Sequence, residues 1–291
     1  MSDTPSIIFI NGSIHTIDAD NSVAEAIAIQ GDRILLIGSN TDVRAQARSE
    51  TQIIDLAGRT VTPGFIDAHQ HFAGIGASQD AIDCKAPGMN SVAALVEEVR
   101  KRAAIQPEGT WIRGRGYNDS KLAENRHPNA MDWDAVAPNH PVWFTRTCGH
   151  IGSFNSAAMQ LAEVEATLSD PDGGRFDRNS AGEIIGVAYE RATVPFRDVL
   201  QPSKIEIKEH LRTANRLDLA SGLTSIHDAG GMTGLPLEQA LDLVATDELQ
   251  VRIYSFVTVN ALDHPHVPIL ETGIKTGFGN QQIRIGAFKI M

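Results

Sequence analysis

The sequence has few cysteines, no excess of positive charge and no long apolar run, and each shortage excludes a class of protein. Its 291 residues contain only Cys84 and Cys148, too few for a disulfide scaffold, so both are expected to be reduced and packed. Lysine and arginine number 25 against 36 acidic residues, and the net charge of −11 argues against a nucleic-acid-coating protein. No apolar run approaches the ~20 residues of a membrane helix, and Met1–Ile10 lacks a secretory-signal pattern. We therefore expect a soluble, cytoplasmic protein with no nucleic-acid or membrane partner.

The first 62 residues are predicted to form a small β-sandwich module. Three dipeptides that tolerate tight turns, Asn11-Gly12, Gly31-Asp32 and Ala57-Gly58, each separate two short apolar segments. We expect each dipeptide to connect two paired strands. The expected strands are 6–10, 14–18, 26–30, 33–38, 52–56 and 60–61.

From Pro63 onward, strands alternate with amphipathic helices, which predicts an α/β domain over residues 63–291. The expected strands are 65–71, 141–147, 223–228, 250–260 and 283–291, and the expected helices are 91–104, 156–166, 203–221 and 237–245, with a surface excursion at 170–186. Ser203 and Glu206 form a capping-box pattern, and Gly222 fits the left-handed residue after that helix. Such alternation builds a parallel sheet with outer helices, either open or closed into a barrel. No glycine-rich phosphate loop follows any strand, which argues against a nucleotide site.

The strongest chemical signal is the segment PGFIDAHQH at residues 63–71. Alternate residues of a strand point to the same side, so Asp67, His69 and His71 are expected on one face. Two imidazoles at this spacing can bind one metal ion at ~2.0–2.1 Å. The polar end of the strand is its carboxyl end, where barrel enzymes assemble their sites. Two solvent-facing histidines at a strand end are the alternative.

PGFIDxHxH after a small β-module resembles the start of the metal-dependent hydrolases of the amidohydrolase superfamily. Later segments resemble the branch that contains the N-substituted formamide deformylases: WIRG at 111–114, GH and NS at 149–150 and 155–156, GLTSIHD at 222–228, and GAFK at 286–289. The resemblance implies a (β/α)8 TIM-type barrel with a β-sandwich built from both ends of the chain. Residues 63–291 are then expected to be the N-terminal part of the barrel, truncated and inactive alone.

The resemblance also implies roles for individual residues. His69 and His71 match the metal ligands of the first barrel strand. Asp67 matches a residue that orients a ligand, with a plain strand-end carboxylate as the alternative. Lys289 matches the lysine that is carbamylated and bridges two metals in binuclear members. The family's general-base aspartate and two further histidine ligands have no counterpart identified in this chain.

Elementary chemistry supports a lysine at position 289. Ile283, Ile285 and Ala287 are expected on the same strand face, and burial there would disfavour the charged ammonium. A neutral amine can add carbon dioxide, and the carbamate's two oxygens suit metals ~3.5–4 Å apart. The alternative is a lysine that extends from the strand end to water. The family's bridging lysine lies on barrel strand four, whereas the strands counted here place Lys289 on the fifth.

His150, Asn155 and His227 are candidates for the substrate pocket because each ends or follows a strand. The alternatives are a packed loop residue for His150, a helix N-cap for Asn155 and structural hydrogen bonding for His227. Cys148 stands where the family often has an acidic residue. The polar contact that such an acid would make is therefore not expected to carry over to this chain. The HPH segment at 264–266 contains a proline and is expected in a loop.

The sequence thus predicts a metal-dependent hydrolase of C–N bonds in non-peptide amides, cyclic amides or N-formyl groups. One or two divalent ions, with zinc expected, would activate water for attack on a small amide-type molecule. Two alternatives stay open: a non-catalytic binding or assembly module derived from such an enzyme, and a deaminase with one metal and an ordinary amine at Lys289. The individual substrate and a homo-oligomeric state cannot be read from the sequence.

Overall fold

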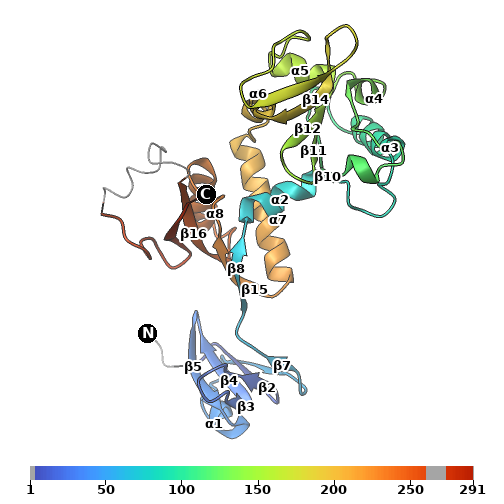
Figure 1. Cartoon of the computed structure of the whole chain (residues 1–291). Coiled ribbons are helices and arrows are strands. Elements are labelled where there is room, and N and C mark those ends of the chain that lie inside the picture. The colour runs from blue at the N-terminus through green and yellow to red at the C-terminus, as the bar shows by residue number, and fades with distance from the viewer. Residues whose placement is uncertain (1–3, 260–272, 291) are drawn as a thin grey trace. The chain divides into compact units, whose positions relative to one another are not determined.

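The computed structural model describes residues 4–259 and 273–290 (Figure 1). The chain divides into two compact units, one formed by Met1–Ile66 with Gly222–Ser225 and the other by Asp67–Ser221 with Ile226–Met291. Within the described ranges, no helix is both long and apolar enough to cross a membrane.

The N-terminal unit contains two small sheets, with the strand orders β5-β4-β1-β6 and β3-β2-β7. Its elements are β1 (Ile7–Ile10), β2 (Ser13–His15), β3 (Val23–Ala24), β4 (Ala26–Gln30), β5 (Arg33–Gly38), α1 (Asn40–Arg44), β6 (Gln52–Asp55) and β7 (Thr60–Val61). Buried Ile8 and Ile10 form one apolar cluster with Val43 of α1. Buried Ile14 belongs to a second cluster that includes Leu56.

Only one of the three expected strand pairs forms a hairpin. β4 and β5 pair in antiparallel fashion around Gly31-Asp32, as predicted. β1 and β2, expected to pair around Asn11-Gly12, enter different sheets, and so do β6 and β7 around Ala57-Gly58. These two pairing predictions are wrong because strands distant in sequence compete for the same edges. β1 pairs with β4 and β6, whereas β2 pairs with β3 and β7.

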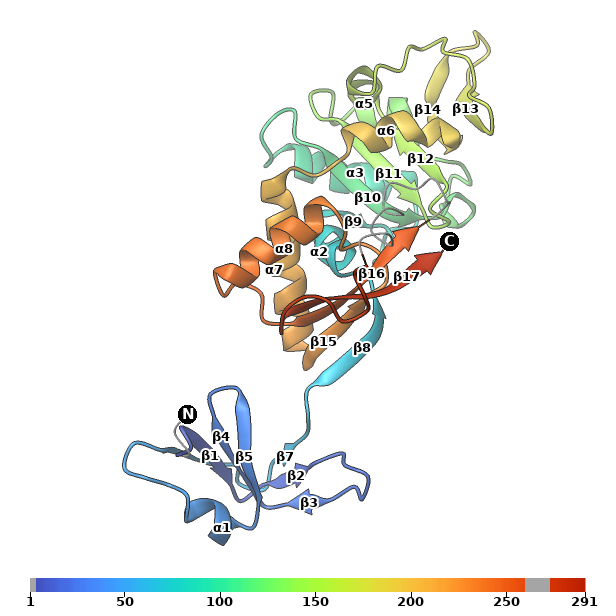
Figure 2. The same ribbon diagram turned by 90° about the vertical axis from the view of Figure 1, so that its left-hand side faces the viewer.

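A four-stranded sheet with the order β17-β16-β15-β8 carries the core of the second unit. Its strands are β8 (Phe65–Gln70), β15 (Leu223–Asp228), β16 (Arg252–Val259) and β17 (Ile283–Ile290). Helices α2 (Phe72–Asp80), α7 (Lys204–Ala220) and α8 (Leu235–Ala245) cover one face of this sheet (Figure 2). Leu211 of α7 packs in one apolar core with Ile226 and Ile253 of the strands.

The carboxyl ends of these four strands meet at one edge of the sheet. The N–H of Ala229, just after β15, donates to the carbonyl of Gln70 at the end of β8 (2.7 Å). The Thr258 hydroxyl, near the end of β16, donates to the carbonyl of Gly230 (3.4 Å). Lys289, near the end of β17, donates to the carbonyl of Ala229 (3.0 Å). The sheet therefore gathers its strand ends as the alternation of strands and helices predicts.

Between α2 and α7 the chain forms a second sheet, with the order β13-β14-β12-β11-β10-β9. The elements of this segment are β9 (Ile82–Asp83), α3 (Val92–Ala103), β10 (Ile112–Tyr117), α4 (Ala130–Asp134), β11 (Val142–Arg146), β12 (Ile151–Phe154), α5 (Ser156–Leu161), β13 (Gly174–Arg178), β14 (Ile184–Glu190) and α6 (Val194–Val199), with short 3-10 helices at Asp119–Lys121 and Arg191–Thr193. β9, β10 and β11 are parallel, and β12, β14 and β13 extend the sheet in antiparallel fashion. The expected surface excursion at 170–186 instead contains β13 and the start of β14.

The second sheet corrects the strand count for Lys289. The strand expected at 141–147 is β11, which belongs to the six-stranded sheet. Without it, β17 is the fourth strand of the four-stranded sheet along the chain. Lys289 therefore lies on the fourth strand, not the fifth.

The helix ends agree with most of the local signals in the sequence. α3 begins after the N-cap Ser91, and Ser203 and Glu206 form the predicted capping box of α7. Gly222 adopts the expected left-handed conformation, with φ of 79°. The helix expected at 156–166 is shorter, because α5 ends at Leu161.

The contact of α2 with α7 leaves no room for a side chain at Gly76. A Cβ at this buried position would overlap the backbone of His210, whereas one at exposed Gly74 would meet only the Cβ of His71, at 3.6 Å. We expect Gly76→Ala to lower the free energy of unfolding by about 1–3 kcal/mol, because the helices must move apart. Gly74→Ala should leave stability unchanged or raise it by up to about 1 kcal/mol, because alanine favours helix. Urea unfolding followed by circular dichroism checks both variants, and equal effects would contradict the close contact of Gly76 with His210.

Candidate metal centre

The end of β8 brings two imidazoles together. The rings of His69 and His71 are both exposed, with centroids 5.7 Å apart and planes at 75°. The carboxylate of half-buried Asp67 accepts the backbone N–H of His69 (2.9 Å), which fixes the chain just before the rings. Within the described part of the chain, neither imidazole has a hydrogen-bond partner. The ring nitrogens are thus available to a ligand.

Gln70 anchors the opposite side of β8. Its Nε2 donates to Oδ1 of Asp218 on α7 (3.0 Å), and both side chains are buried. Burial raises the pKa of the Asp218 carboxyl; the Gln70 hydrogen bond opposes this shift, and the charge of Asp67 adds to it. The contact holds β8 against α7 on the side away from the imidazoles.

Asp228, the last residue of β15, joins two segments of the chain. Its fully buried carboxylate accepts the N–H of Phe72 (2.8 Å) and three successive N–H groups of the loop 230–232 (2.6–3.1 Å). Hydrogen bonds to an ionised acceptor are strong, and four of them offset the cost of burying the charge. Because Phe72 directly follows His71, this carboxylate fixes the backbone beside the second imidazole.

Lys289 lies on a different strand face from the one expected. In the pairing of β16 with β17, Ser255 lies opposite Ile285, whereas Thr258 lies opposite Lys289. β17 has one residue more than β16 between these pairs, so the alternation of sides shifts. The expectation that Lys289 shares a face with Ile283 and Ile285 is therefore wrong. The bulge that causes the shift leaves no trace in the apolar alternation of the sequence.

Half-buried Lys289 lies at the same edge of the sheet as the two histidines. β15 and β16 lie between β8 and β17. The Nζ of Lys289 nevertheless donates to the carbonyl of Ala229, and the N–H of Ala229 donates to the carbonyl of Gln70, between the histidines. No three His, Cys, Asp or Glu side chains among the described residues are grouped to hold a metal. The structure places two imidazole donors together and links Lys289, through the backbone of Ala229, to the backbone of Gln70 between them.

His227 and His150 lie in different surroundings. The half-buried ring of His227 has its centroid 5.0 Å from that of Tyr254 and 6.0 Å from that of Phe256. His150 is exposed, and its Nδ1 lies 3.1 Å from Oε2 of Glu190. The HPH segment at 264–266 lies outside the described residues.

Asn155 is the fully buried N-cap of α5. Its Oδ1 accepts the N–H groups of Ala158 (3.0 Å) and Val142 (2.9 Å), and its Nδ2 donates to two backbone carbonyls (2.8 and 3.1 Å). The amide therefore uses its hydrogen-bonding capacity within the protein. Of the two roles left open by the sequence, the structure shows the N-cap.

Two supporting side chains at this edge were not predicted as such. Gln70 lies between the histidines in sequence but faces the other way, and only its contact with α7 reveals its role. Asp228 has a clearer signal, since an aspartate shortly before Gly230-Gly231 is typical of a carboxylate that binds loop N–H groups.

A family model described as "Amidohydrolase family" matches residues 52–291. An N-substituted formamide deformylase of Arthrobacter pascens is 33% identical over 228 residues, which cover 77% of this chain and 42% of that protein. The putative amidohydrolase YtcJ of Bacillus subtilis is 28% identical over 262 residues, which cover 88% of this chain and 49% of that protein. The chain thus spans about half the length or less of these curated relatives.

The fold resembles that of solved hydrolases. An uncharacterized metal-dependent hydrolase from Pyrococcus horikoshii superimposes with a TM-score of 0.77 at 21% identity, over 97% of this chain and 53% of that chain. A second, from Pyrococcus furiosus, gives a TM-score of 0.75 at 23% identity, over 97% of this chain and 55% of that chain. These likenesses show the fold.

We expect Asp228→Asn to lower the free energy of unfolding by about 1–3 kcal/mol. The amide has one acceptor oxygen instead of two, and its NH2 group would face N–H donors. Asp242→Asn is the control, because Asp242 is exposed and pairs with Lys208 on the surface (2.9 Å). That substitution should change stability by less than about 0.5 kcal/mol. Urea unfolding measures both, and comparable losses would show that the buried hydrogen bonds contribute little.

Proposed function

Because the chain belongs to the amidohydrolase family, we propose that it carries part of the active centre of a metal-dependent hydrolase that cleaves C–N bonds in small, non-peptide amides. The observation that carries this proposal is the pair of exposed imidazoles, 5.7 Å apart, at the carboxyl end of β8. Catalytic groups of barrel enzymes come from the carboxyl ends of the strands, which is where both rings lie.

We propose that the four-stranded sheet is the N-terminal part of a (β/α)8 barrel and that residues 1–62 belong to a flanking β-sandwich module. Helices α2, α7 and α8 on one face of the sheet, with the strand ends gathered at one edge, support this. The rings of His227, Tyr254 and Phe256 form a cluster on β15 and β16. In a closed barrel this cluster would face the interior.

The residues present fit a divalent cation, with zinc as the proposed metal. Imidazole nitrogen is a preferred zinc ligand, and both rings are exposed. His69 and His71 would hold the ion, with Lys289, as a carbamate, as a further ligand able to bridge two ions. A bound cation would polarise the substrate carbonyl and make water more acidic.

The chain's own residues prepare this edge for catalysis. Asp67 fixes the backbone of His69, and Asp228 fixes the start of α2 directly after His71, so the backbone that carries both rings is held in place. The hydrogen bond from Lys289 to Ala229 keeps the amine at the same edge. Loss of a proton from the Nζ ammonium, addition of carbon dioxide to the free amine and release of a second proton would give the anionic carbamate. His227, beside two aromatic rings, would contact an apolar part of the substrate.

An N-formyl or other small amide is the proposed substrate class, since the chain is similar to an N-substituted formamide deformylase. The net charge of −11 supports a small-molecule partner rather than a nucleic acid. The cytoplasm is the proposed location, because the two cysteines form no disulfide.

Zinc binding tests the site directly. Isothermal titration of the chain with Zn²⁺ should show binding that His69→Gln and His71→Gln each weaken at least about tenfold, because each removes a ligand. His150→Gln removes an exposed histidine that pairs with Glu190 and should leave zinc affinity unchanged. No zinc binding by the parent chain, or equal affinity in all variants, would favour a non-catalytic module.

Formate release tests the reaction. The full-length gene product should hydrolyse an N-alkylformamide, and His71→Gln should lower kcat/KM by about 100-fold or more. Lys289→Arg keeps the positive charge but cannot form a carbamate, so it should cause a similar loss. Asp242→Asn, on the exposed face of α8, is the control and should keep the parent kcat/KM. Full activity in Lys289→Arg, with loss in His71→Gln, would point to a one-metal enzyme with an ordinary amine at this position.

A further inference from the structure

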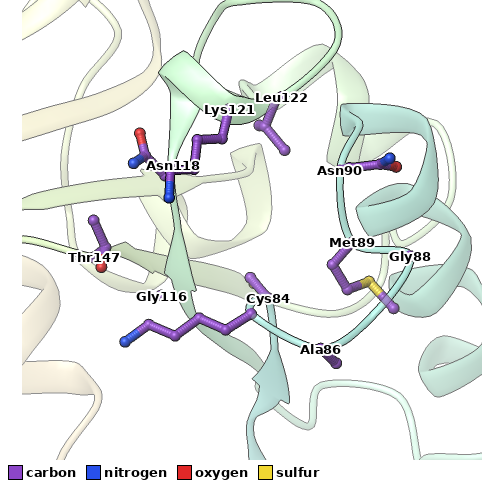
Figure 3. Close-up of a pocket in the computed structure, with 11 residues that line it drawn as sticks. Cys84, Ala86, Gly88, Met89, Asn90, Gly116, Asn118, Lys121, Leu122 and Thr147 are labelled. Carbon is purple, nitrogen blue, oxygen red and sulfur yellow. The ribbon is translucent and has the colours of Figure 1, made fainter.

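A cavity of about 440 Å³ lies at the carboxyl ends of β9, β10 and β11 (Figure 3). It is lined by residues of the loop after β9, of the segment 116–122 around the end of β10, and by Thr147 directly after β11. In open α/β sheets, ligands bind beyond the carboxyl ends of the parallel strands. The cavity is of a size that takes small molecules, and none of the residues of the proposed metal centre lines it.

The lining combines apolar and polar side chains. Figure 3 shows Met89 and Asn90 on one side of the cavity and Asn118, Lys121 and Thr147 on the other. Leu122 and Cys84 add apolar surface. Burial raises the pKa of the Cys84 thiol to about 12, so this thiol is neutral at physiological pH.

Two lysines that line the cavity, Lys85 and Lys121, have no carboxylate partner among the described residues. Within residues 4–259 and 273–290, no carboxylate oxygen lies within 4.0 Å of the Nζ of Lys85 or Lys121. The stem of Lys85 lies against the backbone of Gly116, where a Cβ would come within 2.9 Å of its Cε. The contact with Gly116 holds the Lys85 side chain along the wall of the cavity.

The acidic residues nearest in sequence to these lysines are engaged by other groups. They are Asp83, which accepts the backbone N–H of Lys85 (3.1 Å) and lies 4.0 Å from Arg115; Asp119, which pairs with Arg146 (2.6 Å); and Glu124, which accepts the backbone N–H of Val92 (2.7 Å). The two lysine charges are therefore left for a ligand.

We propose that this cavity binds a small organic carboxylate. The two ammonium groups attract the anionic head, and Asn118 and Thr147 offer hydrogen-bond donors beside it. Met89 and Leu122 provide contact for a hydrocarbon or ring portion. This site is separate from the proposed hydrolase centre and does not depend on it.

The cavity is built differently from a phosphate site. Phosphate sites of α/β proteins use free N–H groups at a helix N-terminus. At the start of α3, beside Asn90, the N–H of Val92 is bound by Glu124 and that of Ala94 by Ser91. The positive charge of the lysines, rather than backbone N–H groups, would therefore select the anion.

Benzoate and benzamide form a matched pair of probes, since they share shape and differ in charge. Their binding to the whole chain, followed by ¹⁵N–¹H NMR, would be compared in the parent and in the double variant Lys85→Gln/Lys121→Gln. Lys101→Gln is the control, because Lys101 is an exposed lysine that pairs with Glu98 on α3. Inorganic phosphate is the third probe.

We expect benzoate to shift the amide signals of residues around Asn118 and Thr147, and benzamide to bind at least about tenfold more weakly. The double variant should lose about tenfold in benzoate affinity, whereas Lys101→Gln should not change it. Added KCl should weaken benzoate binding. The proposal is overturned if benzamide binds as well as benzoate, if the double variant binds benzoate unchanged, or if phosphate binds and benzoate does not. Loss of zinc binding in His69→Gln with benzoate binding intact would separate this site from the metal centre.

Discussion

Four backbone N–H groups converge on the carboxylate of Asp228, and this buried cluster fixes the edge where the strand ends meet. One carboxylate oxygen accepts the N–H of Phe72 at the start of α2, and the other accepts the N–H groups of residues 230–232. Ala229 in turn is bonded to Gln70 on one side and to Lys289 on the other. A buried charge is tolerated only when its hydrogen bonds are complete, so the carboxylate and the loop conformation require one another. Because Phe72 directly follows His71, these hydrogen bonds also fix the backbone of the candidate metal centre.

The sequence predicts the features that depend on neighbouring residues. The same-side placement of His69 and His71 follows from strand alternation, and the capping box of Ser203 with Glu206 follows from the orphan N–H groups of a helix start. The hairpin at Gly31-Asp32 follows from turn chemistry. Each of these signals lies within a few residues, and no distant partner competes with it.

Features that depend on distant partners escape the same reasoning. Asn11-Gly12 has the composition of a hairpin turn, yet β1 and β2 find their partners in different sheets. The strand β11 has the apolar pattern of a barrel strand, but it pairs with β10 and β12 in the six-stranded sheet. The face of Lys289 depends on a bulge that only the pairing of β16 with β17 reveals. The sheet that a strand joins and its register depend on all the strands that could pair with it. The sequence of one segment alone does not contain this information.

In both sheets of the second unit, the candidate binding residues lie at the carboxyl ends of parallel strands. The two sites differ in the charge of the ligand that they suit. At the end of β8, two imidazole rings are exposed without a partner in the described chain, which suits a cation. Beyond β9 and β10, Lys85 and Lys121 are exposed, and no carboxylate in residues 4–259 and 273–290 pairs with them, which suits an anion. In a chain of net charge −11, the second arrangement requires that nearby acids be neutralised, and the pairing of Asp119 with Arg146 does so. Hydrolysis of an amide yields a carboxylate, so the cavity beyond β9 and β10 would bind the product class of the proposed reaction at a site outside the metal centre.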